Sequence, residues 1–138
     1  MNELKIIADT FTADEYITLW NAVWDGAPSR EQTEIALAHS IYRIGVYDGE
    51  KIVAMARMIG DLSLCYYIKD VVVRPEYQRR GIGRMLINDL LGFIRAHGVP
   101  DTEIFVELCA MPDKIPFYEK FGFKANEAQR LRIIYRAE

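Results

Sequence analysis

A turn rich in arginine and glycine, residues 78–84 (Gln-Arg-Arg-Gly-Ile-Gly-Arg), carries residue types suited to binding an anion. Its three arginines supply positive charge on both sides of the two glycines. Gly81 and Gly83 lack a Cβ atom, so a ligand can lie close to the main chain and the backbone can adopt a positive φ. A helix that begins here adds unpaired N–H groups and the positive end of its dipole. The turn therefore predicts a phosphate or pyrophosphate site.

Two common phosphate-binding motifs do not match this turn. A P-loop requires a Gly-Lys pair, and the sequence contains none. A dinucleotide fingerprint requires a third glycine where Leu86 stands, and Asp101 falls in a predicted turn that is poorly placed for a ribose. The alternative is a basic, solvated loop whose glycines serve only the turn. The strand–turn–helix context and the three arginines favour the anion site.

The elements on either side would hold the turn in place. Residues 71–73 are three valines, which favour a buried strand, and Pro75 ends that strand because proline cannot donate to a ladder. From residue 82 to residue 94, apolar side chains recur every three to four positions, which predicts a helix with one apolar face. The helix should end before Pro100.

The rest of the chain mixes predicted strands and helices. Strands are expected at residues 4–8, 41–47, 51–59, 64–73, 103–109 and 131–135, with a small one near Phe123, and helices at 12–24, 29–39, 82–97 and 113–121. Capping boxes at 12–15 and 29–32 mark the first two helices, and Asp48-Gly49 predicts a hairpin. This order predicts an α+β (mixed α/β) fold. Because no repeat or linker interrupts the chain, we expect residues 1–138 to form a single domain.

Composition limits the classes of function. The 138 residues carry a net charge of −3, and the basic residues gather at 74–84, which fits a small anion better than a nucleic acid. No apolar run is long enough for a membrane span or a signal peptide, so we expect a cytoplasmic protein with no nucleic-acid or membrane partner. Cys65 and Cys109 lack metal-ligand spacing, and we expect them to be reduced, buried thiols rather than metal ligands or a catalytic nucleophile.

Two motifs resemble the GNAT N-acetyltransferase superfamily. Gln78, Gly81 and Gly83 match its acetyl-CoA signature [QR]-x-x-G-x-[GA] at the start of a helix. About forty residues later, the segment 116–123 (Pro-Phe-Tyr-Glu-Lys-Phe-Gly-Phe) is similar to the family's late F-Y-x-K-x-G-F segment. The resemblance covers nearly the whole chain. It implies a mostly antiparallel central sheet of six to seven strands with splayed central strands, flanked by about four helices.

The resemblance also implies acetyl-CoA as the acetyl donor, and no metal. The backbones of Val71, Val72 and Val73 would meet the pantetheine as a missing strand would. The pyrophosphate would lie on the turn formed by Gln78, Arg79, Arg80, Gly81, Ile82, Gly83 and Arg84. The late helix would place Phe117 beside the acyl end. Many members have an asparagine just before that helix; here residues 109–113 contain none, so that contact falls to backbone or to Lys114.

The implied reaction is direct attack of a primary amine on the thioester in a ternary complex. Tyr118 occupies the position where many members place the tyrosine that protonates the departing thiolate; the alternative is a ring that only packs the helix. Asp70 is the best acidic candidate for the general base, although it could instead pair with Arg74 or cap a bulge. Glu107, and Tyr66 or Tyr67 through water, are weaker candidates.

The acceptor is left open by the sequence. Trp20, Trp24, Asp25, Tyr66 and Tyr67 could line an aromatic pocket for a cation, although such residues are more often core. A polyamine, an aminoglycoside, an amino acid and a protein amine all fit, and members of the family are often homodimers. Two other functions compete with catalysis: a non-catalytic CoA-binding regulatory module, and a nucleotide-binding domain that uses the glycine turn alone.

Overall fold

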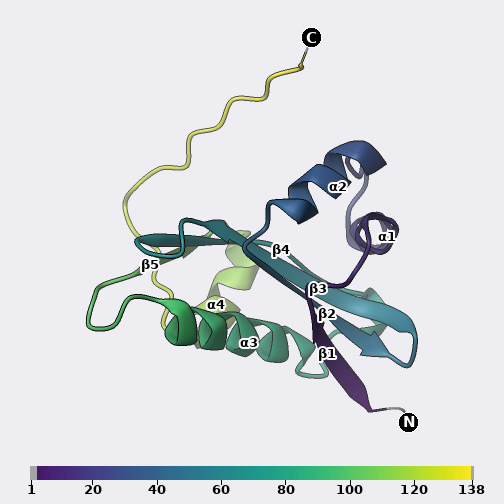
Figure 1. Ribbon diagram of the computed structural model, residues 1–138, viewed down its shortest axis with the longest axis horizontal. Helices are drawn as coiled ribbons and strands as arrows, with labels where there is room; N and C mark the ends of the chain where they lie inside the picture. The colour runs from purple at the N-terminus through teal and green to yellow at the C-terminus, as the bar shows by residue number, and fades with distance from the viewer. Residues whose placement is uncertain (1–2, 138) are drawn as a thin grey trace.

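The computed structural model describes residues 3–137 as one sheet with helices on both faces (Figure 1). The strands are β1 (Leu4–Ala8), β2 (Tyr42–Asp48), β3 (Lys51–Gly60), β4 (Cys65–Val73) and β5 (Phe105–Leu108). The α-helices are α1 (Ala13–Val23), α2 (Arg30–Ala38), α3 (Ile82–His97) and α4 (Ile115–Glu119), and short 3₁₀ turns cover Pro75–Tyr77 and Pro112–Lys114. No helix among residues 3–137 is both long enough and apolar enough to cross a bilayer.

The sheet has the order β1-β2-β3-β4-β5. The first four strands pair with their sequence neighbours in antiparallel fashion, and the connection between β2 and β3 is the Asp48-Gly49 turn expected from the sequence. The strand β5 pairs in parallel with β4, because α3 carries the chain back across the sheet. The mostly antiparallel mixed fold with four helices is confirmed. The expected six to seven strands are not, because residues 3–137 form five.

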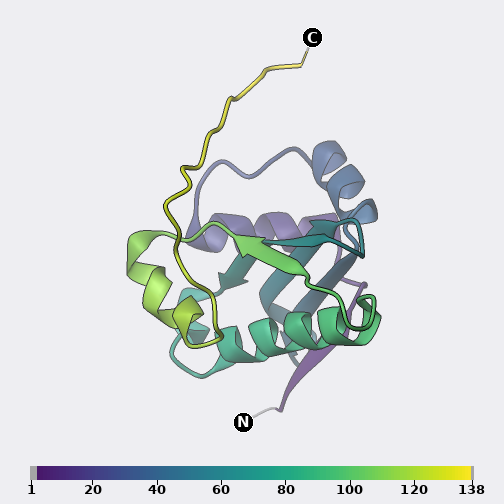
Figure 2. The same ribbon diagram turned by 90° about the vertical axis from the view of Figure 1, so that its left-hand side faces the viewer.

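Two hydrophobic clusters cover the two faces of the sheet. The helix α3 packs on one face through Ile82, Leu86, Ile87, Leu90 and Ile94, all buried, as the apolar periodicity predicts. On the other face, α1 buries Tyr16 and Leu19 against β3 and β4. Thr12 and Glu15 form the expected capping box at the start of α1. Figure 2 shows α1 and α2 on one side of the sheet and α3 and α4 on the other.

The strands β4 and β5 at one edge of the sheet stay paired along only the first part of β4. Their pairing runs from Cys65↔Phe105 to Ile68↔Leu108, whereas β4 continues to Val73. On the opposite edge of β4 the register with β3 shifts between Met55 and Arg57, and Asp70 at this bulge has φ 54°. Because β5 ends at Leu108, the last residues of β4 present an edge that no other strand among residues 3–137 covers.

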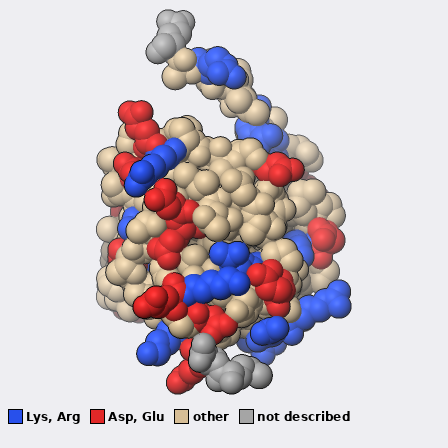
Figure 3. Space-filling view, turned by 90° about the vertical axis from the view of Figure 1, so that its right-hand side faces the viewer, with Lys and Arg blue, Asp and Glu red and all other residues tan. Residues whose placement is uncertain are grey.

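The expected strand at 131–135 is wrong, and so is the small strand near Phe123. Residues 124–137 have no regular secondary structure, and we call this segment the C-terminal arm. Figures 1 and 2 show the arm leaving the body beside β5 and α4, and Figure 3 shows it projecting beyond the rest of the molecule. Alternating apolar residues predict a strand only where a partner edge is available, and the arm pairs with no strand among residues 3–137.

Candidate active site

The glycine-rich turn forms an open start to α3. Gly81 is the N-cap residue, and its left-handed backbone (φ 81°) is a conformation that glycine adopts without strain. No side chain in the described part of the chain caps the helix, so the first N–H groups of α3 have no side-chain acceptor there. Arg79 also has a positive φ, of 65°. This geometry suits an anion placed against the backbone.

The side chains of the turn leave that space accessible. The Gln78 side chain is held against the end of β4, because its Nε2 donates a hydrogen bond to the Val73 carbonyl over 3.0 Å. The Arg80 guanidinium lies 5.0 Å from the centre of the Tyr77 ring. Arg79, Arg80 and Arg84 are exposed, and none of them forms an ion pair with another described residue. Their charge is therefore available to an anionic ligand.

One aromatic ring links the turn to the late helix. A Cβ atom on Gly83 would lie only 3.1 Å from Cζ of Phe117, so the glycine allows this ring to pack against α3. The Phe117 ring meets the Tyr118 ring edge-on, with ring centres 5.0 Å apart. The structure thus brings the two sequence motifs together, although about forty residues separate them.

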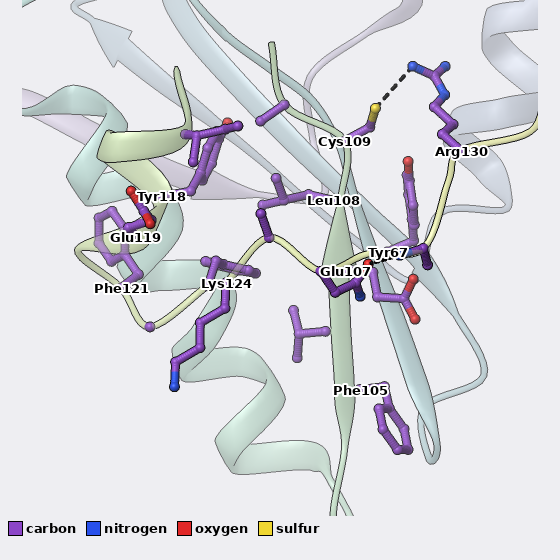
Figure 4. Close-up of a pocket in the computed structure, with 18 of the residues that line it drawn as sticks. Tyr67, Phe105, Glu107, Leu108, Cys109, Tyr118, Glu119, Phe121, Lys124 and Arg130 are labelled. Atoms are coloured by element: carbon purple, nitrogen blue, oxygen red, sulfur yellow. Dashed lines mark hydrogen bonds between the residues drawn. The ribbon is translucent and has the colours of Figure 1, made fainter. Parts of the chain in front are cut away.

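An open cleft of about 1200 Å³ lies between β5, α4 and the first half of the arm. Figure 4 shows Tyr118 from α4 at one side of this cleft, and Tyr67 and Glu107 from β4 and β5 at the other. None of residues 69–84 lines it, so the glycine turn and the free edge of β4 lie outside the cleft. The contact between Gly83 and Phe117 connects the two regions.

Tyr118 has the protonation state that a general acid needs. Burial raises the pKa of its phenol above the usual value of 10.0, so the hydroxyl stays protonated at neutral pH. No side chain or backbone group among residues 3–137 hydrogen-bonds to this hydroxyl. Its proton is therefore available to a group that enters the cleft.

Asp70 is engaged in an ion pair rather than presented to the cleft. Its Oδ2 accepts from Arg57 Nε and from the Tyr16 hydroxyl, each over 2.6 Å. The Arg57 and Asp70 side chains are only 12% and 8% exposed. Burial, and then the hydrogen bond to Asp70, raise the pKa of Tyr16, which keeps it a donor. The network joins α1, β3 and the bulge of β4. Of the two alternatives to a base, pairing with Arg74 does not occur, since Arg74 Nε donates to the Ile52 carbonyl.

We expect Asp70→Asn to lower the free energy of unfolding by about 3 kcal/mol, because it leaves Arg57 largely buried without a counter-charge. Asparagine matches aspartate in size and tolerates the positive φ, so the substitution tests the charge and not the backbone. Urea unfolding monitored by circular dichroism measures the loss. The double variant Asp70→Asn with Arg57→Met should recover part of it. An unchanged unfolding free energy in Asp70→Asn would contradict a structural ion pair.

Sequence reasoning missed Arg57 and Tyr16 as parts of this network. Arg57 stands inside the apolar run of β3, and a charged residue in a buried strand requires a partner, so the signal was present. Which residue becomes the partner of Arg57 depends on the register between β3 and β4. Tyr16 is 54 residues from Asp70, and no local pattern links them.

Other candidate residues are dispersed. Lys114 is exposed beside the start of α4, and Val71 and Val73 are half-buried on the free part of β4. Trp20 packs edge-on against Trp24 and donates from Nε1 to the Asp25 carbonyl. Tyr66 is buried in the cluster under α3, on the other face from α1. The expected aromatic pocket is therefore not assembled from all its members.

The two cysteines are free, but the expectation that both are buried is wrong. Cys65 begins β4 on the face shared with Tyr67, while Tyr66 and Ile68 point into the core. Cys109 follows β5 and is 3.0 Å from Arg130 Nη1. Because each cysteine stands in an apolar stretch of the sequence, the sequence did not indicate which face of the sheet each thiol occupies.

Within residues 3–137, no cluster of His, Cys, Asp and Glu could hold a metal ion.

Comparison with known proteins gives a consistent result. Residues 9–123 match the model of the Acetyltransferase (GNAT) family. An uncharacterized N-acetyltransferase, ycf52, of Porphyra purpurea is 31% identical over 97 residues, covering 67% of this chain and 53% of the relative. Glucosamine 6-phosphate N-acetyltransferase of Trypanosoma brucei brucei is 43% identical over 63 residues, covering 46% of this chain and 40% of the relative. The chain thus spans about half the length of these relatives.

A solved structure shares the fold over almost the whole chain. It is a Staphylococcus aureus protein described as a "Probable Acetyltransferase", with 27% sequence identity and a TM-score of 0.87. The similarity covers 96% of this chain and 100% of that one. The glycine turn, the separation of β4 from β5 and the late aromatic helix described above all lie within residues 9–123.

Proposed function

The chain belongs to the acetyltransferase (GNAT) family, and we propose that it transfers an acetyl group from acetyl-CoA to a primary amine by direct attack in a ternary complex. The observation that carries this proposal is the link from the uncapped start of α3 through Gly83 and Phe117 to Tyr118. It supports the proposal because ring contacts connect the helix start, where an anion could bind, to a phenol that burial keeps protonated. In acetyl-CoA, the pantetheine arm likewise joins a pyrophosphate to a thioester.

The residues present fit such a donor. We propose that the turn Gln78–Arg84 binds the pyrophosphate through backbone N–H groups and the exposed arginines. The free edge of β4 at Val71–Val73 offers main-chain donors and acceptors to the pantetheine amides, in the manner of an added strand. The Phe117 ring packs against Gly83 in the first turn of α3, and Lys114 is the N-cap residue of α4. When bound, the donor supplies the activated acetyl group.

We propose that Tyr118 donates its proton to the departing sulfur. The thiolate is the leaving group when the amine nitrogen bonds to the acetyl carbon, and the C–S bond breaks. The phenol is protonated throughout the neutral range because burial raises its pKa. We propose that a backbone N–H near Val71, at the bulge, polarises the carbonyl oxygen.

The amine must lose a proton before it can attack. An alkylamine with a pKa of about 10.4 is unprotonated in only about one of 2500 molecules at pH 7. Asp70 is less suited to accept this proton than the sequence suggested, since its Oδ2 already accepts from Arg57 and Tyr16. Glu107 is exposed and lines the cleft beside Tyr67. We therefore propose Glu107, directly or through water, as the proton acceptor and Asp70 as the residue that anchors the bulge.

The acceptor is proposed only as a class, a primary amine on a small molecule or a protein. Relatives carry names such as glucosamine 6-phosphate N-acetyltransferase and histone acetyltransferase, which cover both. We also propose that residues 1–138 act as one domain and that the protein forms a homodimer. The cytoplasmic location stays a prediction from the sequence; two relatives are named as chloroplastic.

Two measurements test this function. Calorimetric titration with acetyl-CoA should show binding in the micromolar range, with NAD as the control ligand. A screen of primary amines that reports the release of free thiol should then identify acceptors. Binding of acetyl-CoA without thiol release for any amine would favour the regulatory module, and preferential binding of NAD would favour a nucleotide-binding domain. No binding of acetyl-CoA by the folded protein would overturn the proposal.

A further inference from the structure

The face of β4 and β5 that points away from α3 is polar. Tyr67 and Glu107 stand opposite each other in the parallel register of the two strands, and their sequence neighbours pack in the cluster under α3. Lys69 follows Tyr67 on this face, and Cys109 follows Glu107. The Lys69 Nζ lies 5.9 Å from the centre of the Tyr67 ring, which agrees with this placement. Together with Arg130 of the arm, these residues form what we call the β4–β5 patch.

Arg130 brings a guanidinium from the C-terminal arm onto this patch. Its Nη1 lies 3.0 Å from Cys109 Sγ, and Figure 4 shows it on the same side of the cleft as Tyr67 and Glu107. A thiol is a weak acceptor, so this contact uses little of the donor capacity of the guanidinium. Arg130 forms no ion pair with any residue from 3 to 137. The guanidinium is therefore available to an anion that enters the cleft.

The Glu107 carboxylate shares the patch with this guanidinium, yet the two charges do not pair with each other or with another described residue. An ion pair with a guanidinium would lower the pKa of a carboxyl and weaken it as a proton acceptor. Because the two charges stay apart, Glu107 can accept a proton while Arg130 holds an anion. Glu119 and Lys124 also line the cleft, but Figure 4 shows them apart from Glu107 and Arg130, on the other side.

The two opposite charges are offset along the strand. Glu107 and Cys109 stand two positions apart in the sequence, which corresponds to about 7 Å in an extended chain. Arg130 contacts the thiol at the second of these positions. Lys69 adds another cation at the same level, because it follows Tyr67 on β4 as Cys109 follows Glu107 on β5. One end of the patch therefore suits an amine that loses a proton, and the other end suits an anion.

We propose that the acceptor is a small amine that also carries an anionic group, a carboxylate or a phosphate, several bonds from its nitrogen. Glu107 takes the proton of the amine, while Arg130, with Lys69 beside it, binds the anion. This inference rests on the transfer function proposed above and names the class of its acceptor.

The transfer step is otherwise unchanged. The amine nitrogen bonds to the acetyl carbon, the C–S bond breaks, and the sulfur takes the proton of Tyr118. The proton on Glu107 then passes through water to restore the phenol. An acceptor that arrives as an ammonium ion loses one further proton to solvent.

The charges of the patch disfavour two other classes of amine. A neutral alkylamine leaves Arg130 and Lys69 without an anion. A diamine or polyamine brings a second positive charge against these two cations, and like charges repel. Glu107 is the one carboxylate of the patch, so it cannot serve two ammonium groups. The patch therefore ranks amines by the charge at their far end.

Matched acceptors of similar chain length test the charge at the far end. δ-Aminovalerate ends in a carboxylate, aminobutyl phosphate in a phosphate, pentylamine in a methyl group and cadaverine in a second amine. With acetyl-CoA, thiol release should give a kcat/KM about tenfold or more higher for an anionic amine than for pentylamine, because hydrogen bonds to charged groups contribute about that much. The faster of the two anionic amines distinguishes carboxylate from phosphate. An equal or higher kcat/KM for pentylamine or cadaverine would overturn the acceptor class.

Substitution of Arg130 tests the residue that binds the anion. Arg130→Gln should lower the ratio of kcat/KM for the preferred anionic amine to that for pentylamine by about tenfold or more. Arg130→Glu should reverse the order, so that cadaverine exceeds δ-aminovalerate. The side chain is exposed on the arm, so neither variant should unfold the protein. Arg136→Gln removes the same charge from the arm outside the cleft and should keep the ratio. An unchanged ratio in Arg130→Gln would overturn the role of Arg130.

Failure of this inference is separate from failure of the transfer function. No thiol release with either anionic amine would overturn the acceptor class, while release with another amine in the broader screen would leave the transfer in place. Acetyl-CoA titration of Arg130→Gln keeps the two sites apart as well. Its affinity for acetyl-CoA should be unchanged, since the proposed donor site lies on residues 71–84.

Discussion

Replacement of Gly81 by aspartate should weaken acetyl-CoA binding by about 100-fold while the protein stays folded. The new carboxylate would stand at the N-cap of α3, where we propose that the pyrophosphate lies. Two like charges about 4 Å apart repel by about 1 kcal/mol in water and about 4 kcal/mol near a protein surface. An intermediate value corresponds to roughly two orders of magnitude in affinity. Calorimetric titration measures the change.

Gly81→Asn is the matched control, because asparagine has the shape of aspartate without its charge. Both residues tolerate the left-handed conformation better than other side chains, so the backbone strain is similar. No atom lies within 4 Å of a Cβ placed on Gly81, so neither variant should disturb the packing. We expect Gly81→Asn to lose only a few-fold in affinity. Equal affinities of the two variants would place the pyrophosphate elsewhere.

Tyr118→Phe should reduce kcat by about 100-fold or more and leave the affinity for acetyl-CoA unchanged. The substitution removes the proton donor but keeps the ring that packs between Phe117 and Phe123. General acid catalysis typically contributes factors of 10²–10⁴. Thiol release under saturating substrates measures kcat, and titration measures the affinity. Turnover that is unchanged for every accepted amine would show that Tyr118 only packs the helix.

The pH dependence provides a second measurement of the same role. The acid form of Tyr118 is present below its raised pKa and is lost as the pH rises through that value. The kcat of the unsubstituted protein should therefore decline at a higher pH than an ordinary phenol would produce, and Tyr118→Phe should lack this decline. Tyr67→Phe, which removes another phenol from the same cleft, is the control. An equal loss of kcat in both variants would indicate a water relay rather than a single acid.

The sequence by itself determined the elements and motifs that depend on local chemistry. The capping box of α1, the glycine N-cap of α3 and the apolar stripe from Ile82 to Ile94 are all as expected, because residues within a few positions of one another decide them. The Asp48-Gly49 hairpin belongs to the same class. The family follows from two such local motifs in the correct order.

Only the tertiary structure decided which distant groups meet. Asp70 pairs with Arg57 because the bulged register of β4 on β3 aligns them, and Tyr16 joins because α1 packs on that face. The phase of alternation placed Cys65 outside the core although its neighbours are apolar. Residues 131–135 have the pattern of a strand, yet a strand forms only when an edge accepts its hydrogen bonds. Local propensity can indicate that an element will pair, but the partner is chosen by the packing of the whole sheet.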